Sequence, residues 1–194
     1  SVLEFLQYEF AVQWKKVKDY ANEEGHKILG DIPIYVSADS VDAWVGGELF
    51  ELDAQGGFAR VAGCPPDYFS ADGQLWGNPL YNWPYHKQTG YAWWVRRVRH
   101  ALGIYDLLRI DHFRGFDTYW AIPADSSTAR TGKWENGPGM DLFRALEAAL
   151  GKLPITPKIW PTSCQCPPSC LAAALRHEGP SVRLRRRRHE YLPT

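Results

Sequence analysis

The chain has 194 residues and a mass of 22.1 kDa, and its 45% hydrophobic and 23% charged residues are typical of a globular protein. It contains no apolar run of the roughly 18 residues that a membrane-spanning helix requires, and it opens with no charged-then-apolar signal peptide. A formal net charge of zero argues against a protein that mainly binds polyanions. We therefore expect a globular protein without membrane partners and without a mainly nucleic-acid-binding function.

The charge is unevenly distributed along the chain. Residues 1–155 carry five more acidic than basic side chains, and residues 156–194 carry five more basic than acidic ones. The second segment also holds three of the four cysteines and six of the 14 prolines, but only two of the 27 aromatic residues. This difference in composition indicates that two differently composed polypeptide segments are joined near residue 155.

Helical and strand-like patterns alternate along the first segment. Apolar residues recur at steps of three and four from Leu3 to Ala21, which predicts an amphipathic helix that ends near Gly25. The first apolar strand contains Pro33, which requires an edge or irregular position. The other predicted helices span residues 89–101 and 140–150, and the predicted buried strands span residues 27–36, 105–110 and 153–155.

This alternation is typical of an α/β protein with a parallel sheet. An open doubly wound sheet and a closed (β/α)8 barrel share the pattern, but about 155 residues are too few for the usual barrel of roughly 250. The pattern therefore fits an open sheet or a slice of a barrel. Residues 37–87 interrupt it as a long loop rich in Gly, Pro and aromatic residues, with one short helix near residues 40–49. Loops of this length tend to be functional.

A charged motif lies where the second predicted strand ends. Functional groups of parallel α/β folds collect at the carboxyl ends of strands, and residues 109–115 leave the strand there. Asp111 is flanked by Arg109 and Arg114, whose charges favour its carboxylate form. This carboxylate suits a nucleophile or a metal ligand, and a buried Arg–Asp pair that only fixes the strand end explains the pattern equally well.

Two further features fit a sugar site. Asp31 lies in the first predicted strand, where a purely structural carboxylate is the simpler interpretation. The loop over residues 65–79 combines aromatic rings, which stack on the C–H faces of sugars, with amides and carboxylates that bind hydroxyls. Large aromatic residues also fill cores for their area alone, so both interpretations stay open at this point.

The tail carries two weaker patterns. Cys164, Cys166 and Cys170 lack the paired spacing of a structural zinc site, so we expect no metal there. The run Arg185–Arg188 has the composition of a nucleic-acid-binding patch.

Four motifs in sequence order carry a resemblance to a known family. They are Gly30-Asp-Ile-Pro-Ile-Tyr-Val36, Pro65-Pro-Asp-Tyr-Phe-Ser70, Gly73-Gln-Leu-Trp-Gly-Asn-Pro-Leu80 and Arg109-Ile-Asp-His-Phe-Arg-Gly-Phe116. Over residues 3–155 the chain resembles the bacterial amylomaltases, 4-α-glucanotransferases that disproportionate maltodextrins. The resemblance implies a (β/α)8 TIM barrel with inserted subdomains, of which this chain is an incomplete interior slice with a long aromatic-rich insertion loop.

The resemblance also implies a cofactor-free retaining mechanism. In it one carboxylate attacks the anomeric carbon and a second carboxylic acid protonates the leaving sugar. By its place in the motif Asp111 is the nucleophile, Arg109 holds its charge and geometry, and His112 contacts the sugar. Asp31 matches a carboxylate near the subsite of the cleaved sugar. The loop that closes over the glucan and excludes water is matched by Tyr68, Phe69, Trp76 and Asn78.

The chain departs from the family where the proton donor is expected. Family strands resembling Leu-Pro-Ile-Ile-Ala-Glu-Asp-Leu-Gly carry the donor Glu, whereas this chain reads Leu153-Pro-Ile-Thr-Pro-Lys-Ile-Trp160. Deletion of one T from ATC ATC GCC GAA GAT CTG G gives ATC ACG CCG AAG ATC TGG, which encodes residues 155–160 as they stand. We hypothesise several small insertions or deletions, in the gene or in its sequencing; genomic DNA that does not realign in another frame refutes this. Under the hypothesis residues 1–155 are part of a catalytic barrel, and residues 156–194 are an aberrant, disordered tail.

These observations predict a fragment of a cytoplasmic 4-α-glucanotransferase whose substrate is an α-1,4-glucan or maltooligosaccharide. Loss of general acid catalysis alone costs about 10²–10⁴-fold, so we expect the chain as given to be inactive. One alternative is a non-catalytic α-glucan-binding module, and a weaker one is a nucleic-acid-binding protein that uses the basic tail. A slice with about three strands is also expected to expose sheet edges and apolar helix faces, and so to be poorly stable alone.

Overall fold

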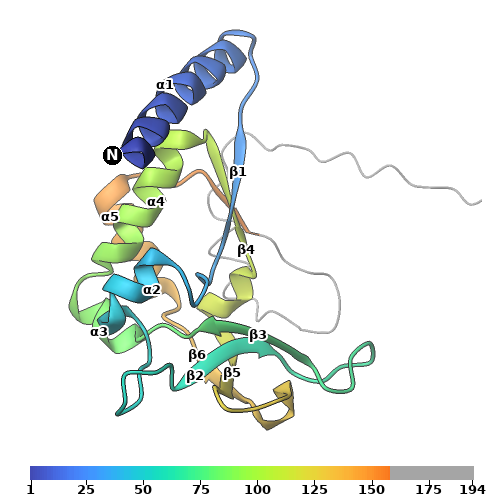
Figure 1. The fold of residues 1–194 in the computed structure, drawn as a ribbon. Helices are drawn as coiled ribbons and strands as arrows, with labels where there is room; N and C mark the ends of the chain where they lie inside the picture. The colour runs from blue at the N-terminus through green and yellow to red at the C-terminus, as the bar shows by residue number, and fades with distance from the viewer. Residues whose placement is uncertain (158–194) are drawn as a thin grey trace, which may run out of the picture.

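The centre of the fold is a three-stranded parallel sheet in the order β1-β4-β7 (Figure 1). The computed structural model describes residues 1–157. A helix precedes each strand, and α4 packs against both α1 and α5. This arrangement confirms the predicted α/β class. The helices are α1 (Val2–Glu23), α4 (Ala92–Ile104) and α5 (Met140–Leu150), and the strands are β1 (Leu29–Pro33), β4 (Leu107–Asp111) and β7 (Ile155–Pro157).

A second, antiparallel sheet in the order β3-β2-β5-β6 lies beyond the carboxyl ends of β1 and β4 (Figure 1). Its strands are β2 (Arg60–Cys64), β3 (Gln74–Pro79), β5 (Thr118–Pro123) and β6 (Lys133–Asn136). Short helices lie in the connections between the two sheets: α2 (Val41–Val45), η1 (Gly47–Leu49), α3 (Trp83–Gln88) and η2 (Phe113–Phe116). A further one, η3 (Ala129–Thr131), lies between β5 and β6.

The prediction of a mostly irregular loop over residues 37–87 is confirmed only in part, because it missed two regular elements. The segment contains the β2–β3 hairpin as well as α3, although the short helix expected near residues 40–49 is present as α2. Glycines within these strands weaken the local strand signal, and Gly63 is required because a Cβ there would clash with the Gln74 carbonyl across the hairpin. The pairing of β2 with β5, far along the chain, supplies what the local pattern lacks.

The first predicted strand is shorter and less buried than expected. Strand β1 pairs only with β4 among the described residues, so its other edge is open, as the presence of Pro33 requires. Within it Gly30 is buried, whereas Leu29 and Asp31 are exposed. The continuous apolar run that predicted a fully buried strand thus belongs to an edge strand.

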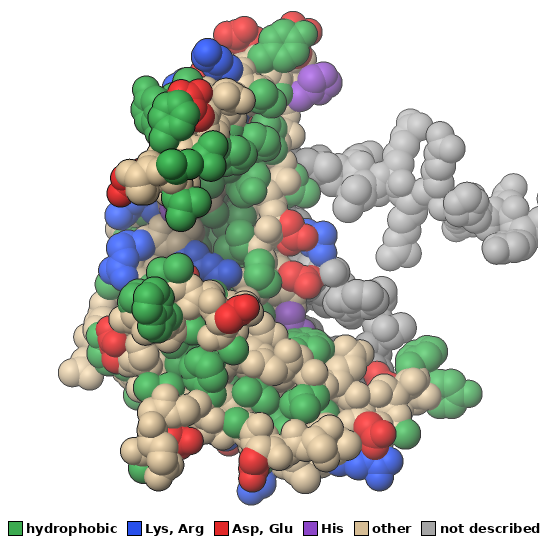
Figure 2. Space-filling view, viewed as in Figure 1, with side chains coloured by type: hydrophobic (Ala, Val, Ile, Leu, Met, Phe, Trp, Pro, Cys, Tyr) green, Lys and Arg blue, Asp and Glu red, His purple; other side chains and the backbone are tan. Residues whose placement is uncertain are grey.

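Helix α1 confirms the predicted helix but leaves much of its apolar face uncovered. The side chains of Leu3, Leu6 and Phe10 are more than half exposed, and hydrophobic side chains gather on the surface over α1 (Figure 2). Its contacts with the rest of the molecule include a hydrogen bond from Trp14 Nε1 to the Ile104 carbonyl, 2.9 Å long. The expected exposure of apolar helix faces and sheet edges is confirmed for α1 and β1.

Most large aromatic residues serve the core. The rings of Tyr81, Trp83, Trp93, Trp94 and Phe116 are buried and contact one another at centroid distances of 5.1–6.4 Å. For these residues the interpretation that aromatic side chains fill a core is correct, and their number alone is no sign of a sugar site.

No helix within residues 1–157 is long and apolar enough to cross a membrane. The predictions about the tail concern its disorder, its cysteine cluster and its arginine run, and they lie outside the described residues. Only the first two tail positions are described, and they form the end of β7. The proposed domain division at residue 155 stays a prediction.

Candidate active site

The carboxyl ends of β1 and β4 lie side by side. The register pairs Asp31 with Arg109 and Pro33 with Asp111, so Asp111 is the last residue of β4 and lies next to the last residue of β1. This placement confirms that Asp111 lies at the carboxyl end of a parallel strand, where α/β folds collect functional groups. Asp31, by contrast, is the middle residue of β1, not an end residue.

One guanidinium connects the two carboxylates. Arg109 Nη1 lies 3.1 Å from Asp31 Oδ2, and Arg109 Nη2 lies 3.5 Å from Asp111 Oδ1. The side chains of Asp31 and Asp111 are 51% and 42% exposed, so both carboxylates are reachable from solvent. Both acidic candidates are thus joined through Arg109, in agreement with its expected contact with Asp111.

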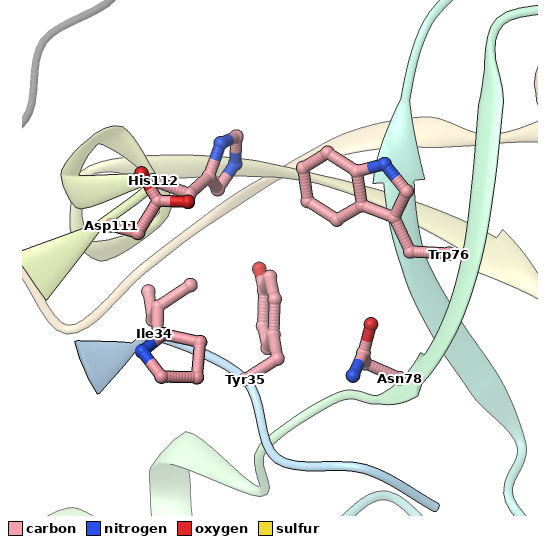
Figure 3. Close-up of a pocket in the computed structure, with 7 residues that line it drawn as sticks. Ile34, Tyr35, Trp76, Asn78, Asp111 and His112 are labelled. Atoms are coloured by element: carbon pink, nitrogen blue, oxygen red, sulfur yellow. The ribbon is translucent and has the colours of Figure 1, made fainter. Parts of the chain in front are cut away.

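His112 follows Asp111 in a left-handed conformation, with φ 51° and ψ 42°. This turn directs the imidazole across the site, where its ring meets that of Trp76 edge-on at a centroid distance of 4.8 Å (Figure 3). Burial lowers the pKa of His112, the charge of Asp111 opposes this effect, and Arg114 adds to it. The imidazole is therefore neutral at pH 7, with one nitrogen as donor and the other as acceptor.

A pocket of about 160 Å³ lies beside Asp111 and His112. Its lining includes four predicted residues: Asp111 at the end of β4, His112 directly after it, and Trp76 and Asn78 from β3 of the second sheet. Asn78 donates from Nδ2 to the Val36 carbonyl at 2.8 Å, and its side-chain oxygen faces the space between Tyr35 and Trp76 (Figure 3). The complete lining is Pro33, Ile34, Tyr35, Trp76, Asn78, Asp111 and His112.

Tyr68 and Phe69 do not line this pocket. They lie at the tip of the β2–β3 hairpin, 97% and 84% exposed, with their rings in edge-on contact at 5.6 Å. Asp67 fixes the tip, because its Oδ1 accepts hydrogen bonds from the backbone N–H groups of Phe69 and Ser70 at 2.9 and 2.8 Å. The structure therefore separates the predicted loop residues into a pocket pair and an exposed pair.

Tyr35 is a pocket residue that the sequence analysis missed. Its ring lies within 6.4 Å of Trp76 and 6.3 Å of His112, and burial, followed by nearby Tyr119 and Tyr81, raises the pKa of its phenol well above the usual value. The phenol is therefore a neutral hydrogen-bonding group. A signal was present, since Ile34 and Tyr35 directly follow β1 just as His112 follows β4.

The arrangement suits sugar chemistry. A carboxylate lies at the pocket mouth, two aromatic rings offer stacking faces, and the neutral imidazole, the phenol and an amide offer hydroxyl partners. Within residues 1–157 no group of three or more His, Cys, Asp or Glu side chains is placed to hold a metal ion.

Comparison with known proteins decides the family. The glycoside hydrolase family 77 profile, described as 4-alpha-glucanotransferase, matches residues 1–157. The chain belongs to this 4-alpha-glucanotransferase family. A 4-alpha-glucanotransferase of Clostridium butyricum is 51% identical over 152 residues, which are 78% of this chain and 31% of the relative. One from Streptococcus pneumoniae is 53% identical over 149 residues, which are 77% of this chain and 30% of the relative.

Solved structures agree with this assignment. An amylomaltase from Streptococcus agalactiae, solved in complex with acarbose, superimposes with a TM-score of 0.83 and 47% identity, over 88% of this chain and 34% of the other. The amylomaltase of Corynebacterium glutamicum, at 23% identity and a TM-score of 0.75, shares the fold. The fold of this 4-alpha-glucanotransferase family member is thus an incomplete slice of the amylomaltase TIM barrel, and the chain spans about a third of the length of its relatives.

Proposed function

We propose that this chain forms the nucleophile side of a retaining 4-α-glucanotransferase site that acts on α-1,4-glucans. The observation that carries the proposal is the Asp111 carboxylate at the carboxyl end of β4, beside a pocket that also contains the rings of Trp76 and Tyr35. Family membership and the acarbose complex of the S. agalactiae relative support a ligand of the α-glucan class.

In the first step a carboxylate oxygen of Asp111 attacks the anomeric carbon, and the bond from that carbon to the leaving sugar's oxygen breaks. The glycosyl group is then carried on Asp111 as an ester. In the second step the oxygen of an acceptor glucan hydroxyl attacks the same carbon, the bond from that carbon to Asp111 breaks, and the hydroxyl proton passes to the acid/base residue that the complete family site supplies. Two successive inversions retain the configuration. Transfer replaces hydrolysis when the closed site excludes water.

The other residues of the site position the sugar. Arg109 neutralises and orients Asp111, and Asp31 on the same guanidinium accepts sugar hydroxyls. His112 and the Asn78 side-chain oxygen bind hydroxyls within the pocket, while Trp76 stacks on a sugar face. Tyr68 and Phe69 at the hairpin tip close over the bound glucan; this movement is part of the proposal.

We infer that the chain as given turns over no glucan. The leaving sugar needs a proton, and the position expected for the donor Glu is occupied by the sequence Thr156-Pro-Lys158. A fluoride leaving group needs no such proton, because fluoride is a weak base that departs with the bonding electron pair. A glycosyl fluoride therefore tests the nucleophile without the acid.

The experiment incubates the full chain with α-maltosyl fluoride and maps any adduct by mass spectrometry. We expect one maltosyl ester on Asp111, formed as C1 binds a carboxylate oxygen and the C1–F bond breaks. Asp111→Asn should form no adduct, whereas Asp125→Asn, at an exposed turn outside the pocket, should react like the wild type. Modification elsewhere, or none in the wild type, contradicts the assignment of Asp111 as nucleophile.

The same chain also tests the alternative, a non-catalytic α-glucan-binding module, which the missing donor Glu favours. Isothermal titration with maltoheptaose should detect binding that Trp76→Ala weakens about tenfold, since loss of one stacking ring costs roughly 1–2 kcal/mol. Trp44→Ala is the matched control, because Trp44 is 85% exposed and lies outside the pocket. Binding without any maltosyl adduct supports the binding module, and absence of both overturns the glucan proposal.

We also propose a cytoplasmic location for the protein, in keeping with its family. Relatives include bacterial enzymes and chloroplastic or amyloplastic enzymes of plants, such as that of Solanum tuberosum. Fractionation of the source cells, with antibody detection of the chain, tests the location. Recovery in the membrane or secreted fraction contradicts it.

A further inference from the structure

The pocket wall formed by residues 33–35 is held by side chains that lie outside the pocket. Beyond Pro33 this segment has left the parallel sheet, so its carbonyl groups need partners other than the strand ladder. Side chains supply them. Arg97 Nη2 donates to the Pro33 carbonyl at 2.7 Å, Arg97 Nη1 donates to the Ile34 carbonyl at 3.0 Å, and Tyr81 Oη donates to the same Ile34 carbonyl at 2.8 Å.

Arg97 is itself fixed in place. It lies on α4, and its guanidinium carbon lies 5.2 Å from the ring centroid of Trp93 and 5.2 Å from that of Trp94. Both rings attract the cation, and a planar guanidinium keeps its donors in a rigid fork. The fork is directed at two successive carbonyls, with a further contact of 3.2 Å from Nη1 to Tyr81 Oη. Hydrogen bonds from a charged donor are stronger than those between neutral groups.

The carbonyls that Arg97 binds precede Tyr35, whose ring lines the pocket. The Tyr35 ring stacks on that of Tyr81 at 6.0 Å with an interplanar angle of 22°, while the Tyr81 hydroxyl binds the carbonyl immediately before Tyr35. Tyr81 therefore contacts both the ring of Tyr35 and the carbonyl of the residue before it, and Arg97 binds that same carbonyl. Arg97 is not among the pocket-lining residues, so it acts on the pocket only through this segment.

We propose that Arg97 is a positioning residue of the glucan pocket: together with Tyr81 it holds the Pro33 and Ile34 carbonyls, and thereby sets the place of Tyr35 opposite Trp76 and His112. This inference rests on the proposed function for the identity of the ligand. The observed geometry, in which the Arg97 guanidinium binds the backbone where the chain leaves β1, does not depend on the proposed function. A shift of about 1 Å in such a wall weakens the fit to a bound molecule substantially.

The test uses the full chain and two readouts, both taken below the unfolding transition of every variant. The first is the affinity for maltoheptaose by titration calorimetry. The second is the NMR signal of the His112 ring carbon between its two nitrogens, assigned by comparison with His112→Gln. His112 lies beside Tyr35, so its signal reports the position of the wall without any ligand.

We expect Arg97→Met, which keeps the aliphatic stem but removes the fork, to shift the His112 signal and to weaken maltoheptaose binding about tenfold. Arg97→Lys should recover part of both effects, because an ammonium still reaches one carbonyl. Arg96→Met, at an exposed neighbouring position of α4, is the matched control and should change neither. Tyr81→Phe removes only the hydroxyl and keeps the ring, so it tests the same contact if Arg97→Met does not fold; we expect a smaller shift of the same kind.

A purely structural role predicts lower thermal stability with an unchanged His112 signal and unchanged affinity in the folded variants, and that result overturns the inference. If the wild type binds no maltoheptaose, the proposed ligand is wrong, and the His112 signal alone then decides whether Arg97 sets the wall. A signal in Arg97→Met and Tyr81→Phe equal to that of Arg96→Met rejects the positioning role in either case.

Discussion

Asp31 and Arg109 are register partners on the neighbouring parallel strands β1 and β4, and their charged groups approach to 3.1 Å. Register partners face the same side of a sheet, so this contact follows directly from strand pairing. The second nitrogen of Arg109 reaches Asp111 two residues further on, at 3.5 Å. One guanidinium therefore serves two carboxylates that are 80 positions apart in sequence.

Replacement of Arg109 by Lys should slow formation of the maltosyl ester on Asp111. A lysine ammonium is a single point charge that cannot bridge two carboxylates as a planar fork does. We expect the rate of reaction with α-maltosyl fluoride to fall by roughly tenfold to a hundredfold, that is about 1.4–2.7 kcal/mol. Arg130→Lys, in an exposed ion pair with Asp72, is the control and should react as the wild type does. Equal rates for both variants would show that Arg109 does not assist Asp111.

His86 should make the fold sensitive to mild acid. Its side chain is fully buried, and burial lowers the pKa of His86 to about 4, although a hydrogen bond between Nε2 and the Leu49 carbonyl at 3.1 Å acts in the opposite direction. Between the unfolded pKa of about 6.5 and the folded value, the unfolded chain binds a proton that the folded chain does not. The free energy of unfolding should therefore fall by up to about 3 kcal/mol as the pH drops from 6.5 to 4.

His86→Gln keeps a donor for the Leu49 carbonyl but cannot titrate. Urea unfolding at pH 7, 5.5 and 4.5 measures the free energy of unfolding, which should fall less steeply with pH in His86→Gln than in the wild type. His100→Gln, at an exposed position of α4, is the control. If the free energy of unfolding falls equally between pH 7 and 4.5 in all three proteins, His86 is not the cause of the acid sensitivity.

Two glycines of the barrel slice should respond to alanine in opposite directions. A Cβ at Gly30 in β1 would overlap the Tyr105 ring, so Gly30→Ala should destabilise the fold by about 1–3 kcal/mol. Gly103, near the end of α4, has open space at its Cβ position, so Gly103→Ala should stabilise by about 0.5–1 kcal/mol through helix propensity. Thermal unfolding of the two variants measures both, and shifts of the same sign would contradict the packing seen here.

Helix α1 should depend on Asp106 for its attachment. Asp106 Oδ2 accepts hydrogen bonds from the Ile28 N–H at 2.8 Å and from Asn22 Nδ2 at 2.9 Å, and Lys18 Nζ lies 3.5 Å from Oδ1. Asp106→Ala leaves these donors without that acceptor, which should cost about 1–3 kcal/mol. Hydrogen exchange of the α1 amides should accelerate accordingly.

Asp19→Ala is the control for this attachment. Its carboxylate pairs with Lys15 across the α1 surface, at side-chain exposures of 52% and 74%, and such pairs are worth about 0.3–0.5 kcal/mol. Equal exchange rates in Asp106→Ala and Asp19→Ala would mean that α1 is held by its apolar contacts instead.

Local patterns were sufficient for the elements of the parallel sheet. The apolar periodicity before Gly25 and the run Met140–Leu150 predict helices close to the observed bounds. A helix that buries one face repeats its apolar residues every three to four positions, so the pattern can be recognised within a short stretch of sequence. The antiparallel sheet was missed, since β2 and β5 are each stabilised by a partner distant in sequence. The prediction that β1 is a buried strand was wrong for the same reason. The number of strands that pair with β1 depends on distant parts of the chain, and its own residues do not reveal it.

By itself the sequence determined the family resemblance, the α/β class and the place of Asp111 at a strand end, because each depends on patterns among residues that are close in sequence. Only the tertiary structure decided which candidates share a pocket. It brought Trp76 and Asn78 to Asp111 and His112 and placed Tyr68 and Phe69 on an exposed tip. It also added Tyr35, which follows the Ile34 carbonyl that Arg97 and Tyr81 bind. The physical reason is that segments distant in sequence come together to form the pocket. Their relative positions are stabilised by strand pairing and side-chain packing between distant parts of the chain.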